Sequence, residues 1–180
     1  MTMLSIQDAK SIQITESTLA SPVKFPAVSV SIASEQCRSD FLANQLGSRA
    51  AVVFEHGLYT VAQFLCDEYV ENYWEFAELD DGKVFFCYPR SGKFYTCANN
   101  FNLSSGVMDN KTFGMICTII TLGNIFGQVL PSDACLIADK LDNAKDWVFD
   151  TLYEQVCNSG DSCKIFEYHK FSRKIYNFIN

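Results

Sequence analysis

The sequence lacks the local marks of several common protein classes. It has no CxxC pair, no cysteine–histidine cluster with zinc-ligand spacing, and 2 histidines in 180 residues. The patterns GxSxG, HExxH, GxxxxGK[ST] and GxGxxG do not occur. His56, His169 and Cys163 could serve as base or nucleophile only beside a partner supplied by the fold, and no motif supports this. We therefore predict a protein that is not an enzyme, with no catalytic residue, no metal ligand and no cofactor.

Positive charge is also scarce. Against 21 Asp and Glu there are 14 Lys and Arg, which gives a formal net charge of −7. Duplex binding without sequence preference needs Lys and Arg that displace counterions from phosphates, so direct nucleic-acid binding is not expected. An acidic balance fits a chain that meets other proteins or imitates nucleic acid, and it equally fits solubility alone.

Long apolar runs are missing as well. The strongest, over residues 115–126, is too short to span a bilayer and is expected to be a buried helix. Residues 1–10 carry no basic run followed by an apolar stretch, so no secretory signal and no membrane association are expected, and the predicted location is cytoplasmic. In that compartment the 8 cysteines should be reduced and mostly buried as small hydrophobes.

What is present suffices for one domain with a substantial core, since 48% of residues are hydrophobic. Residues 1–38 are rich in Ser and Thr, with strand-like alternation at 11–15 and 28–32, and we expect an N-terminal arm that is partly extended or loosely ordered. Residues 39–180 are expected to form the domain proper. The oligomeric state is not predicted.

Hydrophobic spacing sets the expected elements of that domain. It predicts a helix over residues 49–69 and strands over 73–79, 83–88 and 93–98. Gly82 supplies the positive φ of a tight turn between the first two strands, and Pro89 ends the second. Asp109 is expected to cap a central core helix that runs to residue 127. Pro131 should break the chain, and further helices are predicted over 132–155 and 162–180.

This order of elements predicts the fold class. Strands that are grouped together and followed by grouped helices favour an α+β single domain, with a small antiparallel β-meander packed against a helical layer.

A run of carboxylates without any Lys or Arg surrounds the first of these strands. Strand alternation predicts Trp74 and Phe76 facing the core and Glu75 facing solvent. The run fits an interaction surface for a basic partner, a divalent-metal site built from oxygen ligands, or a solvated sheet edge without a special role. Its members are Asp67, Glu68, Glu71, Glu75, Glu78, Asp80 and Asp81.

Short runs spread over residues 41–180 carry a family pattern. They include Phe64-Leu65-Cys66-Asp67-Glu68-Tyr69, Tyr73-Trp74-Glu75-Phe76, Tyr88-Pro89 and Met108-Asp109-Asn110-Lys111-Thr112-Phe113-Gly114-Met115. Together they resemble the ArdB/KlcA family of antirestriction proteins. The resemblance assigns structural roles to Tyr69, Tyr73, Trp74, Phe76, Leu79, Gly82, Pro89, Asp109 and Gly114.

The resemblance also implies a function. ArdB/KlcA proteins are carried on plasmids and other mobile elements, inhibit type I restriction endonucleases and are not known to be enzymes. The implied partner is a type I restriction complex or associated host nuclease machinery, met through protein–protein contact. Three other readings stay open: an acidic DNA mimic that fills a DNA-binding groove, a metal-dependent carboxylate enzyme, and a folded relative whose activity has drifted.

Overall fold

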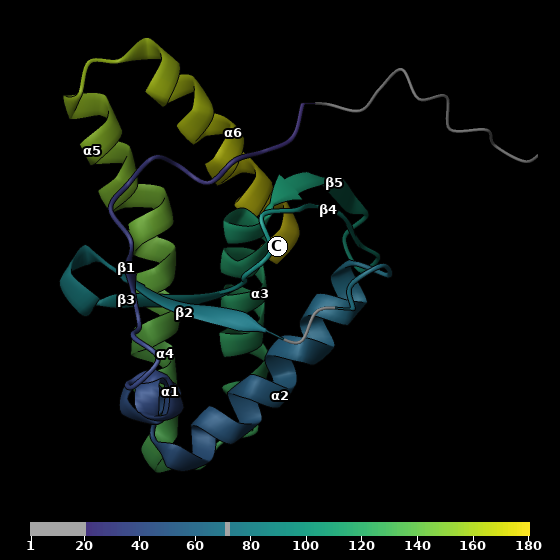
Figure 1. Cartoon of the computed structure of the whole chain (residues 1–180), viewed down its shortest axis with the longest axis vertical. Coiled ribbons are helices and arrows are strands. Elements are labelled where there is room, and N and C mark those ends of the chain that lie inside the picture. Colours follow the sequence, from purple (N-terminus) through teal and green to yellow (C-terminus); the bar gives the residue numbers. More distant parts are fainter. Residues whose placement is uncertain (1–20, 71–72) are drawn as a thin grey trace, which may run out of the picture.

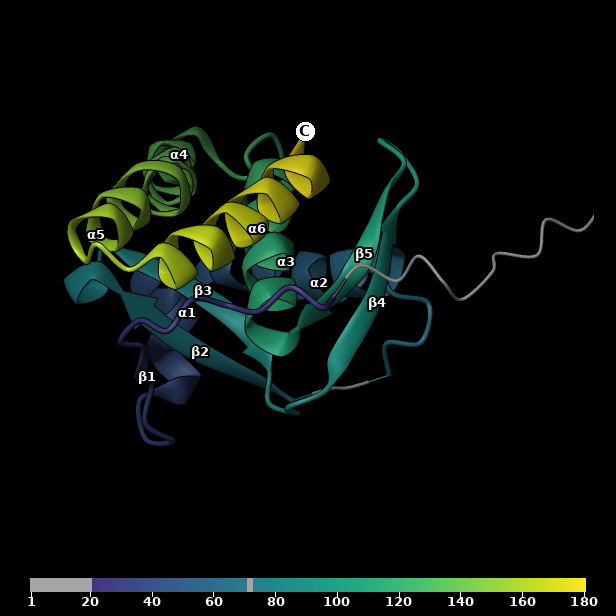
Figure 2. The same cartoon turned by 90° about the horizontal axis from the view of Figure 1, so that it is seen from above.

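One buried helix organises the protein. The computed structural model describes residues 21–70 and 73–180. Helix α3 (Asn110–Ile125) lies in the middle, with the other elements around it (Figure 1, Figure 2). The Asp109 carboxylate accepts a hydrogen bond of 2.8 Å from the Thr112 backbone N–H, which confirms the predicted cap. The helix stops 2 residues short of the predicted end at Gly127.

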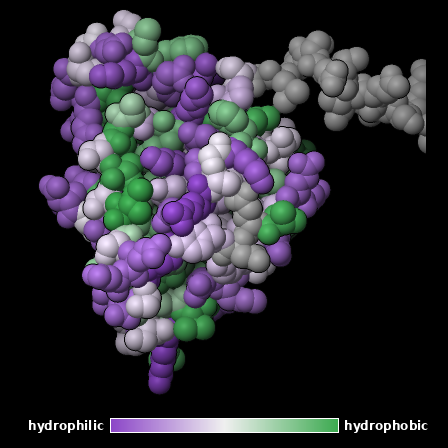
Figure 3. Space-filling model, viewed as in Figure 1, coloured by the Kyte–Doolittle hydropathy of each residue, from purple (hydrophilic) through white to green (hydrophobic). Residues whose placement is uncertain are grey.

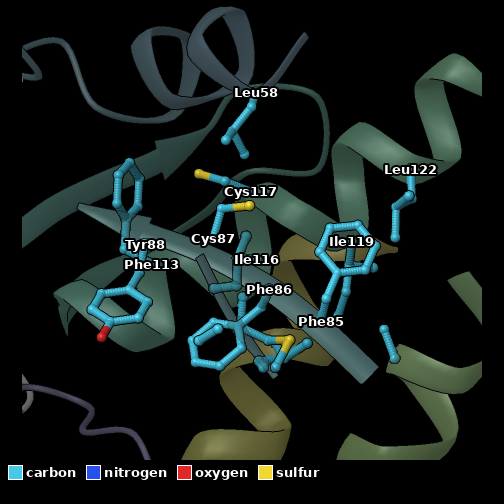
Figure 4. Close-up of a cluster of buried hydrophobic side chains, with 14 of the residues drawn as sticks. Leu58, Phe85, Phe86, Cys87, Tyr88, Phe113, Ile116, Cys117, Ile119 and Leu122 are labelled. Carbon is cyan, nitrogen blue, oxygen red and sulfur yellow. The ribbon is translucent and has the colours of Figure 1, made fainter. Parts of the chain in front are cut away.

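A three-stranded antiparallel sheet packs against α3. It contains β1 (Ser31–Ile32), β2 (Trp74–Leu79) and β3 (Val84–Pro89), in the order β1-β2-β3, with Trp74 opposite Pro89. The predicted turn at residues 80–82 is confirmed as a short 3-10 turn, Asp80–Gly82, with Gly82 at φ 86°. Every residue of β3 is buried, and Figure 4 shows its side chains meeting those of α3 and Leu58.

The third predicted strand belongs to a second sheet. Among the described residues, strand β4 (Phe94–Asn99) pairs only with β5 (Ser104–Asp109), an antiparallel partner that was not predicted from the sequence. The residues Ser104, Ser105 and Gly106 have low strand propensity, which hides β5 in the sequence. The α+β class with antiparallel strands is confirmed, with the strands divided between two small sheets.

Helices α1 (Arg38–Leu46) and α2 (Ser48–Leu65) cover the first sheet. The predicted helix over 49–69 is α2, but it ends at Leu65 because Cys66 adopts an extended backbone with φ −140° and ψ 102°. Helix α1 was not predicted. It is separated from α2 by Gly47 at φ 80°, a left-handed conformation that glycine adopts without a steric penalty.

The C-terminal part is helical. Helix α4 (Pro131–Asp146), a π-helical turn (Trp147–Thr151) and α5 (Leu152–Asn158) follow one another without a break, and α6 (Ser162–Ile179) crosses back after Gly160 (Figure 1). The predicted break at Pro131 is found between α3 and α4, and Pro131 itself is the first residue of α4, one residue before the predicted start of this helix. Proline fits the first position of a helix, where its missing N–H costs nothing. No helix within residues 21–70 and 73–180 has the length and apolarity required to cross a bilayer.

Part of the expected N-terminal arm lies in the core. Phe25 is buried and stacks on Phe86 at 5.2 Å and on Trp147 at 5.9 Å between ring centroids. Its backbone N–H donates to the Asp109 carboxylate at 2.8 Å, so the residue that caps α3 also anchors this segment. The strand-like alternation predicted at residues 11–15 lies outside the described residues.

Candidate functional site

The acids of β2, Glu75 and Glu78, are partly buried. Glu75 was expected to face solvent, but its side chain is only 16% exposed and forms ion pairs with Arg38 at 3.1 Å and Arg90 at 3.3 Å. The Arg38 guanidinium also lies over the ring of Tyr73, 4.1 Å from its centroid. The expectation fails because α1, which was not predicted, brings Arg38 across this face of the strand.

Glu78 is similarly engaged. Its carboxylate accepts a hydrogen bond of 2.6 Å from the Gln45 side-chain amide, whose oxygen accepts one of 2.6 Å from Lys140. Burial lowers the pKa of Lys140, while the nearby Glu78 and Asp139 act in the opposite direction. The chain Glu78–Gln45–Lys140 therefore ties β2 to α1 and α4.

The next two acids lie in the turn after β2. Asp80 and Asp81 have φ 50° and 52°, and Asp80 pairs with Lys83 at 3.4 Å. With Glu78, Trp147 and Gln155 they line an open groove of about 300 Å³. No group of three His, Cys, Asp or Glu suited to hold a metal ion occurs in the described part of the chain.

Asp67 and Glu68 are separate from all of these. Both are exposed, directly after the end of α2, and neither is ion-paired within residues 21–70 and 73–180. Glu71 lies outside the described residues. Strand β2 stands between these acids and Asp80, and six residues of strand span about 20 Å. The acidic run is thus divided into two ends rather than one surface.

The family positions gather around an aromatic cluster. Trp74 is 1% exposed and lies 5.8 Å from Tyr69 and 6.2 Å from Phe113, measured between ring centroids. Tyr95 of β4 stacks on Phe113 at 4.5 Å. Burial raises the pKa of the Tyr69 phenol. These rings join β2, β4 and the start of α3, so the cluster holds the two sheets together.

Gly114 and Thr118 bring α3 into close contact with β3. A Cβ atom at Gly114 would collide with the Cys87 carbonyl oxygen and lie 2.6 Å from Cα of Tyr88. One turn later, the Thr118 hydroxyl accepts a hydrogen bond of 3.0 Å from the Cys87 backbone N–H and donates one to the Gly114 carbonyl oxygen. The helix backbone therefore lies directly on the strand.

The cysteines are free thiols, and half of them are buried: Cys66, Cys87, Cys97 and Cys117. The expectation that most are buried is too strong, since Cys37, Cys135 and Cys163 are exposed. Burial raises the pKa values of the Cys66, Cys87, Cys97 and Cys117 thiols, which keeps them protonated and chemically quiet. His56 on α2 and His169 on α6 are both exposed.

Known proteins resemble this chain in sequence and in fold. No family model matches the chain. The antirestriction protein KlcA of Escherichia coli is 27% identical over 107 residues, which cover 59% of this chain and 75% of KlcA. In sequence the chain is therefore similar to an antirestriction protein of the ArdB/KlcA type.

The chain also shares its fold with a solved structure. That structure superposes with a TM-score of 0.64 at 21% identity, over 84% of this chain and 94% of the other. It comes from work on the KlcA and ArdB proteins, which are described as showing a novel fold and antirestriction activity against type I DNA restriction systems in vivo but not in vitro.

Three exposed apolar residues were not predicted from the sequence as part of a site. Phe101 and Leu103 are 88% and 89% exposed in the loop between β4 and β5, and Phe64 on α2 is 39% exposed. Large apolar side chains inside an Asn-rich turn, Asn99-Asn100-Phe101-Asn102-Leu103, were the available signal. Turns normally contain small and polar residues, so large apolar side chains in this turn indicate a specific role.

Proposed function

We propose that this protein relieves type I restriction of incoming mobile DNA by binding another protein, without catalysing a reaction. The observation that carries the proposal is the likeness to KlcA, a named antirestriction protein, over three quarters of its length. The shared fold supports it, since the structural relatives are described as active against type I restriction systems in vivo.

The proposed partner is a type I restriction complex or nuclease machinery associated with it, met in the cytoplasm. Relatives are described as active in vivo but not in vitro. This contrast favours contact with a component that the cell supplies over simple occupation of the purified nuclease. Among the described residues, Asp67, Glu68 and Asp81 are the acids of the run that are exposed and not ion-paired. We place the contact at Asp67 and Glu68, which follow the exposed Phe64 at the end of α2, and include Glu71, the next acid along the chain.

The arrangement of charges disfavours DNA mimicry. A mimic needs carboxylates spaced along an extended surface as phosphates are along a duplex. In this protein Glu75 is neutralised by two arginines and Glu78 is bound to Gln45, which interrupts any such row. This arrangement of charges fits binding to a protein surface other than a DNA-binding groove.

The test is the plating efficiency of unmodified phage on a host that carries a type I restriction system. Expression of this protein should raise plating, whereas phage already modified by the same host should plate equally with and without it. Unchanged plating of unmodified phage, with the protein present and folded in the cell, would contradict the proposed function.

A further inference from the structure

The loop between β4 and β5 presents an apolar projection. Phe101 and Leu103 are almost fully exposed at its tip, and the Phe101 ring stacks on Phe64 at 5.0 Å between centroids. We call these three residues the hairpin knob. Figure 2 shows the tip of the β4–β5 hairpin projecting from the rest of the protein, on the side away from the face drawn in Figure 3. Contiguous exposed apolar side chains of this kind mark interaction surfaces in soluble proteins.

The tip is fixed to the end of α6. The Asn102 side-chain amide donates to the Asn177 carbonyl oxygen at 2.8 Å, and the Ser104 hydroxyl donates to the same oxygen at 2.6 Å. The buried Asn99 donates to the Phe178 carbonyl oxygen at 2.8 Å and accepts from the Phe101 backbone N–H at 3.0 Å. These carbonyl groups, at the C-terminal end of a helix, have no partner within the helix.

This anchoring matters for binding. An apolar loop that moves freely loses conformational entropy when it docks, whereas a loop already held in place loses little. The hydrogen bonds to α6 therefore reduce the conformational entropy that the hairpin knob loses when it binds a partner.

Leu103 is also held in an unfavourable backbone conformation. Its φ is 58°, in the left-handed region that suits Gly or Asn and is uncommon for a bulky side chain. A loop that served only as a turn would carry Gly or Asn here. Strained conformations persist where the surroundings impose them, and they gather at binding sites.

On the α2 side of the hairpin knob, the neighbouring charges are negative. Asp67 and Glu68 follow Phe64 by three and four residues, are exposed, and form no ion pair among the described residues. On the α6 side, the Lys174 ammonium group donates to the Ser105 carbonyl oxygen at 2.9 Å, so this cation is used to hold the hairpin. A partner surface of complementary charge therefore needs Lys or Arg residues opposite the end of α2.

We propose that the hairpin knob inserts into an apolar pocket flanked by Lys or Arg on a folded protein partner. The proposal rests on the proposed function, because DNA-handling enzymes carry such basic surfaces. The exposed acids disfavour the two other occupants, an anionic membrane and a second copy of this acidic chain.

The experiment compares four forms in the phage plating assay: the wild type, F101S/L103N, D67K/E68K, and F166S as the matched control. Phe166 is 59% exposed on α6, away from the hairpin. Removal of a central apolar contact weakens binding about tenfold or more, so F101S/L103N should lose most of the relief of restriction. D67K/E68K should lose part of it, and F166S should match the wild type.

The outcomes are distinguishable. Loss of relief in F101S/L103N, with its melting temperature at or above that of the wild type, supports the hairpin knob. Full relief in the same variant overturns it and leaves the proposed function standing. If the wild type itself gives no relief of restriction, both the proposed function and the role of the hairpin knob are contradicted.

Two further measurements on the purified proteins test the other occupants. Self-association of the wild type that F101S/L103N abolishes, seen by light scattering, would assign the hairpin knob to a second copy and overturn the proposal. Sedimentation of the wild type with anionic phosphatidylserine vesicles, lost in F101S/L103N, would overturn it in favour of a membrane.

Discussion

Replacement of Gly114 by alanine tests the contact between the central helix and β3. Ordinarily, Gly→Ala inside a helix stabilises it by about 1 kcal/mol, because glycine loses more backbone entropy on folding. At Gly114 the added Cβ would meet the Cys87 carbonyl oxygen and the backbone of Tyr88. Backbone atoms cannot rotate away, so α3 itself must move off the strand.

The magnitude follows from three contributions. Overpacking of a filled core costs about 1–3 kcal/mol, with the upper end expected here because the neighbours are backbone. Displacement of α3 also stretches the 3.0 Å hydrogen bond from the Cys87 N–H to Thr118, which is worth about 1 kcal/mol. After the gain in helix propensity, G114A should be destabilised by roughly 2–3 kcal/mol, which lowers Tm by about 4–12 °C for a domain of this size.

Gly123 on the same helix supplies the matched control. A Cβ atom there meets nothing within 4 Å, so G123A should be neutral or more stable by up to about 1 kcal/mol. Thermal unfolding followed by circular dichroism measures both variants. A Tm for G114A equal to that of G123A would refute the close helix–strand contact and, with it, the structural role of this family position.

Four further predictions concern other parts of the same framework. Thr118→Val removes the acceptor for the buried Cys87 N–H and should cost about 1–3 kcal/mol in urea unfolding, whereas Thr118→Ser should retain most of the stability. Leu103→Asn relieves a left-handed bulky residue and should leave Tm unchanged or raise stability by up to about 1 kcal/mol; a clear decrease would mean that Leu103 packs. Glu75→Gln leaves Arg38 and Arg90 without their charged partner and should cost about 1–2 kcal/mol, whereas Asp81→Asn, an exposed acid without an ion pair among the described residues, should cost nothing measurable. Burial raises the pKa of Cys87, Cys97 and Cys117 above the ordinary value of 9.0, so unfolding releases protons at alkaline pH and stability should fall as the pH rises above about 9; a flat Tm from pH 8 to 10.5 would contradict this.

Much of the fold was accessible from the sequence because local signals there agree with the tertiary structure. The aromatic strand at 74–79, the glycine at residue 82 and the Asp109 cap each act over a few residues, and each is found where it was predicted. The central helix is apolar on most sides, which is the pattern of a helix surrounded by other elements.

The elements that escaped prediction depend on contacts distant in sequence. Helix α1 has a polar composition and is held by Phe41 against Phe76, at 5.5 Å between ring centroids. Strand β5 is stabilised by backbone hydrogen bonds with β4 and with Val23, whose N–H donates to the Val107 carbonyl oxygen. Neither partner can be inferred from the residues of the element itself.

Contacts distant in sequence also explain why the acidic residues do not form the single surface that their order in the sequence indicated. A carboxylate on a strand faces solvent only if nothing covers that face, and α1 covers the β2 acids with Arg38 and Gln45. A charge reversal at Glu75 or Glu78 therefore disrupts packing as well as surface charge, and loss of activity in such a variant would not identify a contact. Reversal at Asp67 or Glu68 changes the surface alone, since both are exposed and unpaired within residues 21–70 and 73–180. The structure thus moves the informative position for a protein partner from the strand to the end of α2, beside Phe64 and the hairpin knob.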